Sequence, residues 1–238
     1  MDKRRAQPAP AFGTPKAVLF DAFGTLFDVY SVSLLAEQLF TGQGDALSRL
    51  WRDKQIEYTQ LLTSDGGSHY QPFWALTQAS LRYSAALLGL PLNAAQELQL
   101  MNQYRALSAF PENRDVLQAL KAKGVVTGIL SNGDPEMLAV AVRSAGLESC
   151  LDHIISVDAV RRYKPHPDTY ALGPKATGVA VRDTLFVSGN SWDALGATWF
   201  GYNTLWVNRH DQPAEQIGPP PSRTGTNLLA ALSFFPSG

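Results

Sequence analysis

The stretch Ala17-Val-Leu-Phe-Asp21-Ala-Phe-Gly-Thr25-Leu-Phe-Asp28 decides our prediction of the fold. Its short apolar run, bounded by Pro15 and Gly24, is typical of a buried strand. The run places Asp21 at the carboxyl end of that strand, directly before a turn. In open parallel α/β sheets, ligands bind in the crevice beyond these strand ends. The position favours Asp21 as a nucleophile, although a helix cap or a turn former is the alternative for this motif alone.

Strand and helix patterns alternate along the chain, except in one helical block. Residues 31–108 contain no strand pattern and predict a helix that begins near Ser31, followed by helices at 45–63, 73–90 and 93–107. The later sequence predicts helices at 115–123, 135–144, 167–176 and 191–200 and strands at 125–130, 154–157, 185–187 and 204–207. Gly173-Pro174 is expected to break or kink the helix that contains it. The pattern predicts an α/β protein with a Rossmann-like parallel sheet and an inserted all-helical cap.

The same pattern predicts how the chain is divided. We expect a core domain of residues 15–30 and 109–210, a cap domain of residues 31–108 and a loose arm at 1–14. A tail at 211–238 is expected to pack on the core, ending in an apolar segment at 228–235. Within this tail, Pro213–Thr226 is rich in Pro and Gly and is expected to be extended or poorly ordered.

Composition and charge exclude several classes of function. The 238 residues carry 20 basic and 21 acidic side chains and a net charge of -1, without the basic stripe that binding of nucleic acid requires. No apolar stretch approaches the length of a membrane span, and residues 1–15 lack the apolar segment of a signal peptide. The single cysteine, Cys150, excludes an intrachain disulfide and favours the cytoplasm. We therefore expect a cytoplasmic protein without a nucleic-acid or membrane partner.

Four further segments carry polar groups at predicted strand ends or in the cap. They are Leu130-Ser-Asn-Gly133, Tyr163-Lys-Pro165, Val187-Ser-Gly-Asn-Ser-Trp-Asp193 and Trp51-Arg-Asp-Lys-Gln-Ile-Glu-Tyr58. Each has an ordinary explanation when it is taken alone: a turn, a surface lysine, a helix cap and a solvated arginine, respectively. Their combination with Asp21 is what favours a reactive site.

Together with the first stretch, these segments resemble the L-2-haloacid dehalogenases of the haloacid dehalogenase superfamily. The resemblance covers about residues 18–207. It depends on the phrases Asp-Ala-Phe-Gly-Thr-Leu-Phe-Asp-Val, Trp-Arg-x-Lys-Gln-x-Glu-Tyr and Ser-x-Asn-x-Trp-Asp, which are specific to that subgroup. It implies hydrolysis of a short 2-haloalkanoic acid to a 2-hydroxyalkanoic acid through an aspartyl ester, with inversion at C2. It also implies a homodimer that needs no cofactor and whose ligands are a 2-haloacid and a halide ion.

The resemblance assigns roles to individual residues. Asp21 would be the nucleophile, Thr25 would steady it and Lys164 would pair with it. Arg52 would bind the departing halide with the help of Asn132, Ser131 would hold the substrate carboxylate, and Asp193 would position or activate water. The implied catalytic set is Asp21, Thr25, Arg52, Ser131, Lys164, Tyr170, Ser188, Asn190 and Asp193, and the implied substrate-binding set is Ala22, Phe23, Ile56, Phe73, Asn132 and Trp192.

Phe23 separates two chemistries within the superfamily. Phosphatase members carry a second Asp at this position, which protonates an alkoxide leaving group. Phe23 can neither donate a proton nor bind a metal, whereas a halide leaves without a proton. We therefore expect dehalogenation without a metal, and keep a phosphatase and a non-catalytic binding protein of the same fold as alternatives.

The chain also departs from the dehalogenase pattern. Phe23 replaces a more usual Tyr, Asp53 a Gln and Gln60 a Trp, and residues 64–68 resemble a small insertion in the cap. Asp53 would repel an anionic substrate if it pointed inward.

Overall fold

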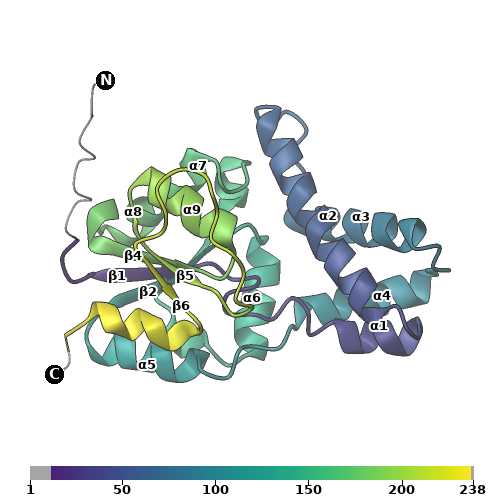
Figure 1. The fold of residues 1–238 in the computed structure, drawn as a ribbon, viewed down its shortest axis with the longest axis horizontal. Helices are drawn as coiled ribbons and strands as arrows, with labels where there is room; N and C mark the ends of the chain where they lie inside the picture. The colour runs from purple at the N-terminus through teal and green to yellow at the C-terminus, as the bar shows by residue number, and fades with distance from the viewer. Residues whose placement is uncertain (1–11, 237–238) are drawn as a thin grey trace.

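The computed structural model describes residues 12–236, and shows a parallel sheet with a block of helices beside it (Figure 1). The strands are β1 (Ala17–Phe20), β2 (Val126–Ser131), β3 (His153–Ser156), β4 (Thr184–Ser188), β5 (Asn203–Val207) and β6 (Arg223–Gly225). They form one six-stranded sheet in the order β3-β2-β1-β4-β5-β6. The α/β class and the parallel sheet predicted from the sequence are confirmed. Most of the predicted arm at 1–14 lies outside the described residues.

Strand β1 lies in the middle of the sheet because all four of its side chains are buried and need cover on both faces. Phe20 is in register with Ile129 of β2 and with Val187 of β4, so the carboxyl ends of the three strands are level. The chain passes from β1 to β2 on one side and later returns to β4 on the other. Asp21, the residue after β1, therefore lies at the point where the strand order reverses, where open α/β sheets bind ligands.

Helices cover both faces of the sheet (Figure 1). Helices α5 (Asn113–Ala122) and α6 (Pro135–Ser144) lie on one face, and α7 (Pro167–Tyr170), α8 (Leu172–Thr177) and α9 (Ser191–Phe200) lie on the other, as right-handed crossovers require. Short 3₁₀ helices occur at Glu148–Cys150, Val157–Val160, Val181–Asp183 and Leu228–Phe234. The last of these packs against α5 and buries Leu228 and Ala231, so the end of the described chain contacts the sheet layer.

The helical block consists of α1 (Ser33–Leu39), α2 (Gly44–Ser64), α3 (Phe73–Leu87) and α4 (Ala94–Arg105). Asn93 caps α4 through a capping box, in which its side chain accepts the Gln96 amide and Gln96 accepts the Asn93 amide. This block corresponds to the predicted cap at residues 31–108. The proposed domain boundaries themselves stay a prediction.

Several local predictions are wrong in detail. The first cap helix begins at Ser33, two residues after Ser31, whose hydroxyl donates to the Asp28 carbonyl. The break expected in the helix at 167–176 is present, but it lies at Ala171, between α7 and α8, rather than at Gly173-Pro174. Strand β6 was not predicted within 213–226, because its three residues, two of them exposed, have no apolar alternation and pair with β5 only at the sheet edge.

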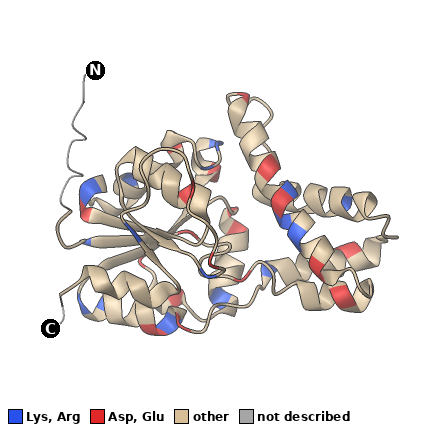
Figure 2. Ribbon diagram, viewed as in Figure 1, with Lys and Arg blue, Asp and Glu red and all other residues tan. Residues whose placement is uncertain are grey.

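Basic and acidic residues are interspersed along the ribbon, both in the sheet layer and in the helical block (Figure 2). Within residues 12–236, none of the helices combines the length and the apolar character that a membrane crossing requires.

Candidate active site

The loop after β1 is held close to the loop after β4. The Ala22 carbonyl accepts the amides of Thr25, Leu26 and Phe27, which closes a tight turn directly after Asp21. Gly24 has φ +90°. A Cβ on Gly189 would lie 2.2 Å from the Gly24 carbonyl oxygen, so only glycine permits this approach of the two backbones. The turn therefore fixes Asp21 against the start of α9.

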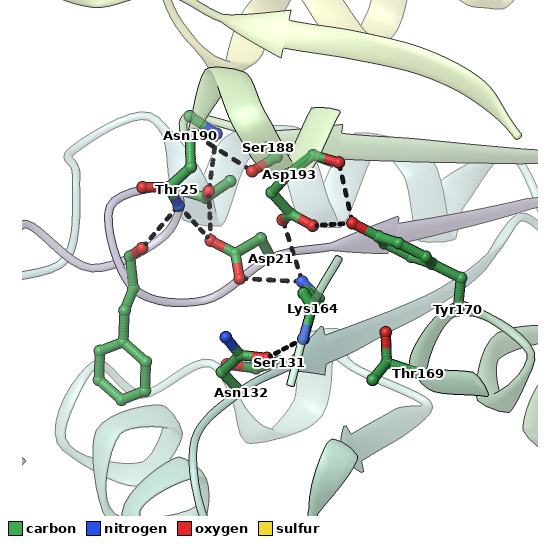
Figure 3. Close-up of polar contacts among 12 residues, drawn as sticks. Asp21, Thr25, Ser131, Asn132, Lys164, Thr169, Tyr170, Ser188, Asn190 and Asp193 are labelled. Atoms are coloured by element: carbon green, nitrogen blue, oxygen red, sulfur yellow. Dashed lines mark hydrogen bonds and ion pairs between the residues drawn. The ribbon is translucent and has the colours of Figure 1, made fainter. Parts of the chain in front are cut away.

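The Asp21 carboxylate is buried, at 6% exposure, and both of its oxygens are bound. Oδ2 accepts from Thr25 Oγ1 at 2.9 Å and from Asn190 Nδ2 at 2.8 Å. Oδ1 accepts from Lys164 Nζ at 3.1 Å (Figure 3). Thr25 is held in turn by the Gly189 amide, which donates to its Oγ1 at 2.8 Å. Three side chains from separate parts of the sequence thus fix the orientation of one carboxylate.

Lys164 contacts a second carboxylate besides that of Asp21, with Asp193 Oδ2 3.0 Å from its Nζ (Figure 3). Lys164 and Asp193 are both fully buried. Burial raises the pKa of Asp193 above its ordinary value, and the Lys164 ammonium opposes that rise. The Tyr170 hydroxyl donates to Asp193 Oδ1 at 2.8 Å, and burial next to Asp193 raises the pKa of Tyr170 well above its usual range. Tyr170 therefore acts as a hydrogen-bond donor to Asp193.

Arg52, on α2, brings a cation from the cap to this group. Its Nη2 donates to Asn190 Oδ1 at 3.1 Å and to the Phe23 carbonyl at 3.2 Å. Its Nη1 donates to Gln55 Oε1 at 2.7 Å. These acceptors are neutral, so the guanidinium charge is oriented but not neutralised by them. Arg52 is only 7% exposed, and an anion in the neighbouring cavity would therefore interact with it strongly.

A pocket lies between Asp21 and Arg52. Besides these two, it is lined by Phe23, Ile56, Thr59, Phe73, Ser131, Asn132, Asn190 and Trp192. Its free volume is about 10 Å³, which is about enough to hold one water molecule. We name it the inner pocket. As the side chains lie, the inner pocket has no room for a molecule much larger than water.

The predicted site residues occupy three positions relative to this pocket. Asp21, Arg52, Ser131, Asn190 and the predicted substrate-binding residues other than Ala22 line it. Thr25, Lys164, Tyr170 and Asp193 lie behind Asp21 as its direct or indirect hydrogen-bond partners. Ser188 accepts the Asn190 amide, and Ala22 contributes its carbonyl to the turn, so neither lines the inner pocket.

A second, larger pocket of about 200 Å³ shares Arg52, Ile56, Asn190 and Trp192 with the inner pocket. We name it the outer pocket. Asp53 is exposed and lines the outer pocket, so it does not point into the inner one. Gln60 is exposed and lines neither pocket.

Within residues 12–236, no three His, Cys, Asp or Glu side chains are grouped as metal ligands would be. A metal-independent reaction stays a prediction.

Sequence reasoning missed the residues that hold Arg52. Gln55 is fully buried, accepts from Tyr104 at 3.0 Å and donates to Thr77 at 2.7 Å. Gln55 could have been found, since residues three apart face the same side of a helix. Tyr104 and Thr77 carry no such signal because they reach Gln55 from α4 and α3.

Comparison with known proteins agrees with this geometry. The family of haloacid dehalogenase-like hydrolases matches residues 15–201. The (S)-2-haloacid dehalogenase of Pseudomonas sp. (strain YL) is 41% identical over 92% of this chain and 94% of its own length. The crystal structure of the L-2-haloacid dehalogenase RSc1362 has 53% identity and a TM-score of 0.91, covering 93% of this chain and 98% of that one. A structure of the Xanthobacter autotrophicus L-2-haloacid dehalogenase with chloropropionic acid covalently bound has 35% identity and a TM-score of 0.85, covering 92% and 98%.

A buried aspartate at the switch point of a parallel sheet, facing a cap, defines a hydrolase of the haloacid dehalogenase class. The chain belongs to the haloacid dehalogenase-like hydrolase family, and specifically to its L-2-haloacid dehalogenases.

Proposed function

We propose that this enzyme hydrolyses the carbon–halogen bond of short 2-haloalkanoic acids, giving 2-hydroxyalkanoic acids with inversion at C2. One observation carries the proposal: Asp21 lines a small pocket opposite Arg52, and the residue two positions later is Phe23, which has no proton to give. A halide leaves as a stable anion and needs a cation rather than an acid. The relatives named above act on haloacids by name, which supports the same substrate class here.

The first step is the attack of an Asp21 oxygen on C2 from the side opposite the halogen. Oδ2 already accepts two hydrogen bonds, whereas Oδ1 accepts one, from Lys164. Oδ1 therefore retains a lone pair, and we assign it as the nucleophile. Arg52 stabilises the leaving halide with the help of Asn132, and Ser131 lies in the same pocket for the substrate carboxylate.

In the second step, water attacks the ester carbonyl carbon of Asp21 and the bond from that carbon to Oδ1 breaks, so Oδ1 leaves in the hydroxyl group of the product. One proton of the water ends on that hydroxyl group and the other passes to solvent. After ester formation through Oδ1, the carbonyl oxygen is Oδ2, on which negative charge develops. Thr25 Oγ1 and Asn190 Nδ2 already donate to this oxygen, so they form an oxyanion hole that needs no rearrangement. Asp193, held by Lys164 and Tyr170, is the nearby carboxylate that orients or activates the water.

Halide release from L- and D-2-chloropropionate tests the proposal. We expect chloride from the L-enantiomer and D-lactate as its product. The phosphatase alternative predicts instead hydrolysis of p-nitrophenyl phosphate that EDTA abolishes. A binding protein predicts no halide from any 2-haloacid. Either result would replace the proposal.

Two further expectations belong to this proposal. The single cysteine, Cys150, is buried and free, which supports the cytoplasm. The resemblance to L-2-haloacid dehalogenases supports a homodimer. Light scattering in solution tests the oligomeric state.

A further inference from the structure

The cap is joined to the core by two segments that pair with each other. The Asp28 amide donates to the Ser108 carbonyl at 2.8 Å, and Phe27 forms an antiparallel bridge with Ala109. The Phe110 amide donates to the Leu26 carbonyl at 3.1 Å. We name residues 24–28 and 108–112 the hinge. The first hinge segment also contains Thr25, whose hydroxyl holds Asp21.

Arg209, which follows β5, contacts both hinge segments. Its Nη2 donates to the Thr25 carbonyl at 3.3 Å. Its guanidinium carbon lies 3.6 Å from the centroid of the Phe110 ring, and its Nη1 is 2.7 Å from Glu112 Oε1. The two charged side chains are only 13% and 15% exposed, so water screens their attraction weakly.

We propose that Arg209 is a positioning residue for catalysis, acting through Thr25 to orient the Asp21 carboxylate and to fix the hinge of the cap. The proposal rests on the proposed function only for its kinetic part. Arg209 lines neither pocket and so does not contact the substrate. The hydrogen bond from Arg209 to the Thr25 carbonyl fixes the Thr25 backbone. The Thr25 hydroxyl, 2.9 Å from Asp21 Oδ2, then holds the Asp21 carboxylate in a fixed orientation.

The chemistry of arginine suits this position. A planar guanidinium can stack on a ring while its edges donate in two directions, whereas a lysine ammonium is a compact charge that cannot stack in the same way. Glu112 is itself fixed, since its Oε1 accepts the Leu228 amide at 3.1 Å. Arg209 therefore connects the core strand, both hinge segments and the C-terminal 3₁₀ helix.

Replacement of Arg209 by methionine tests the kinetic part. We expect kcat per folded molecule for L-2-chloropropionate to fall about tenfold to a hundredfold, because a small misplacement of a reacting group has effects of that order. KM should change little, since no pocket residue is altered. Arg209→Lys should give an intermediate kcat, and it replaces the methionine variant if that one does not fold.

Arg223→Met is the matched control. Arg223 is the first residue of β6, stacks on Phe234 at 4.3 Å and donates to Ser233, but it contacts no hinge residue. We expect it to keep the wild-type kcat. An equal fall in both variants, or no fall in Arg209→Met, would overturn the proposal.

Coupling to Thr25 distinguishes positioning from general stabilisation. In a Thr25→Ala background, Arg209→Met should lower kcat by less than about twofold, because the link to Asp21 is already lost. Fully additive losses would contradict the proposed route through Thr25.

Hydrogen exchange tests the hinge without any substrate. The amides of Asp28 and Phe110 should exchange faster in Arg209→Met than in wild type or in Arg223→Met. Unchanged exchange would overturn the hinge part even in an active enzyme. A wild-type protein that releases no halide but shows the expected exchange would refute the proposed function and leave the hinge role standing.

Discussion

Lys164 of the core and Arg52 of the cap are both buried cations of the site, but their partners differ. Lys164 lies between the carboxylates of Asp21 and Asp193, at 3.1 and 3.0 Å. Arg52 is held by the neutral oxygens of Gln55, Asn190 and Phe23. Lys164 is therefore committed to orienting carboxylates, while the charge of Arg52 remains for an incoming anion. In this site, one cation therefore orients the nucleophile and the other is available to stabilise the leaving group.

The largest expected effect comes from the carboxylate between these cations. Asp21→Asn should lower kcat by at least about 10⁴-fold, because the amide is a poor nucleophile and removal of a nucleophile has effects of this size in other hydrolases. Steady-state chloride release measures the loss. Asp115→Asn, an exposed aspartate in the first turn of α5, is the control. Comparable activity of Asp21→Asn and Asp115→Asn would place the nucleophile elsewhere.

Removal of Arg52, the cation of the cap, tests its role in stabilising the leaving halide. Arg52→Ala should lower kcat/KM about 10²- to 10³-fold, as loss of one group that stabilises developing charge does. The loss should be larger than that in the control Arg82→Ala, since the Arg82 side chain is 61% exposed and pairs with Glu97. Chloride release and circular dichroism together separate lost chemistry from lost folding. A folded Arg52→Ala enzyme with undiminished release would show that the halide leaves from another position.

On the core side, Tyr170→Phe removes the hydroxyl that donates to Asp193. A hydrogen bond to a charged group contributes about 1.5–3 kcal/mol, so we expect kcat to fall about tenfold or more. Tyr83→Phe, on the exposed side of the cap, should have no effect. If the two variants have the same kcat, Tyr170 does not act through Asp193.

The smallest effect concerns stability as a function of pH. Burial raises the pKa of Asp193 in the folded state, so between that pKa and the unfolded value of about 3.9 the folded protein binds the extra proton. This group thus adds stability as pH falls through its folded pKa and removes it as pH rises. The Tm of wild type should rise relative to that of Asp193→Asn as the pH is lowered through this window. A difference that is constant or that shrinks would mean that Lys164, not burial, dominates.

Many of the site residues that belong to the core could be predicted from the sequence, because they follow apolar runs in an alternating pattern of strands and helices. Asp21, Ser131 and Ser188 come at the ends of β1, β2 and β4, and parallel strands bring such ends together. The resemblance to a known family added Lys164 and Tyr170, whose positions no periodicity indicates.

The cap side and the edges were less predictable for physical reasons. Tyr104 reaches Gln55 across 49 residues of sequence, and Arg209 reaches Thr25 across 184, so these contacts exist only after the helices and strands have packed. Strand β6 has three residues and depends on the edge of β5 rather than on its own pattern. Local patterns therefore predicted the strand ends but not the support around the site.

A single turnover in ¹⁸O water tests the central claim most directly. With enzyme in excess over L-2-chloropropionate, mass analysis of the peptide that contains Asp21 should show one heavy oxygen in its carboxylate, and the lactate should carry an ordinary oxygen taken from Asp21. Heavy oxygen in the lactate, with none in Asp21, would mean that water attacks the substrate directly and would contradict the ester mechanism.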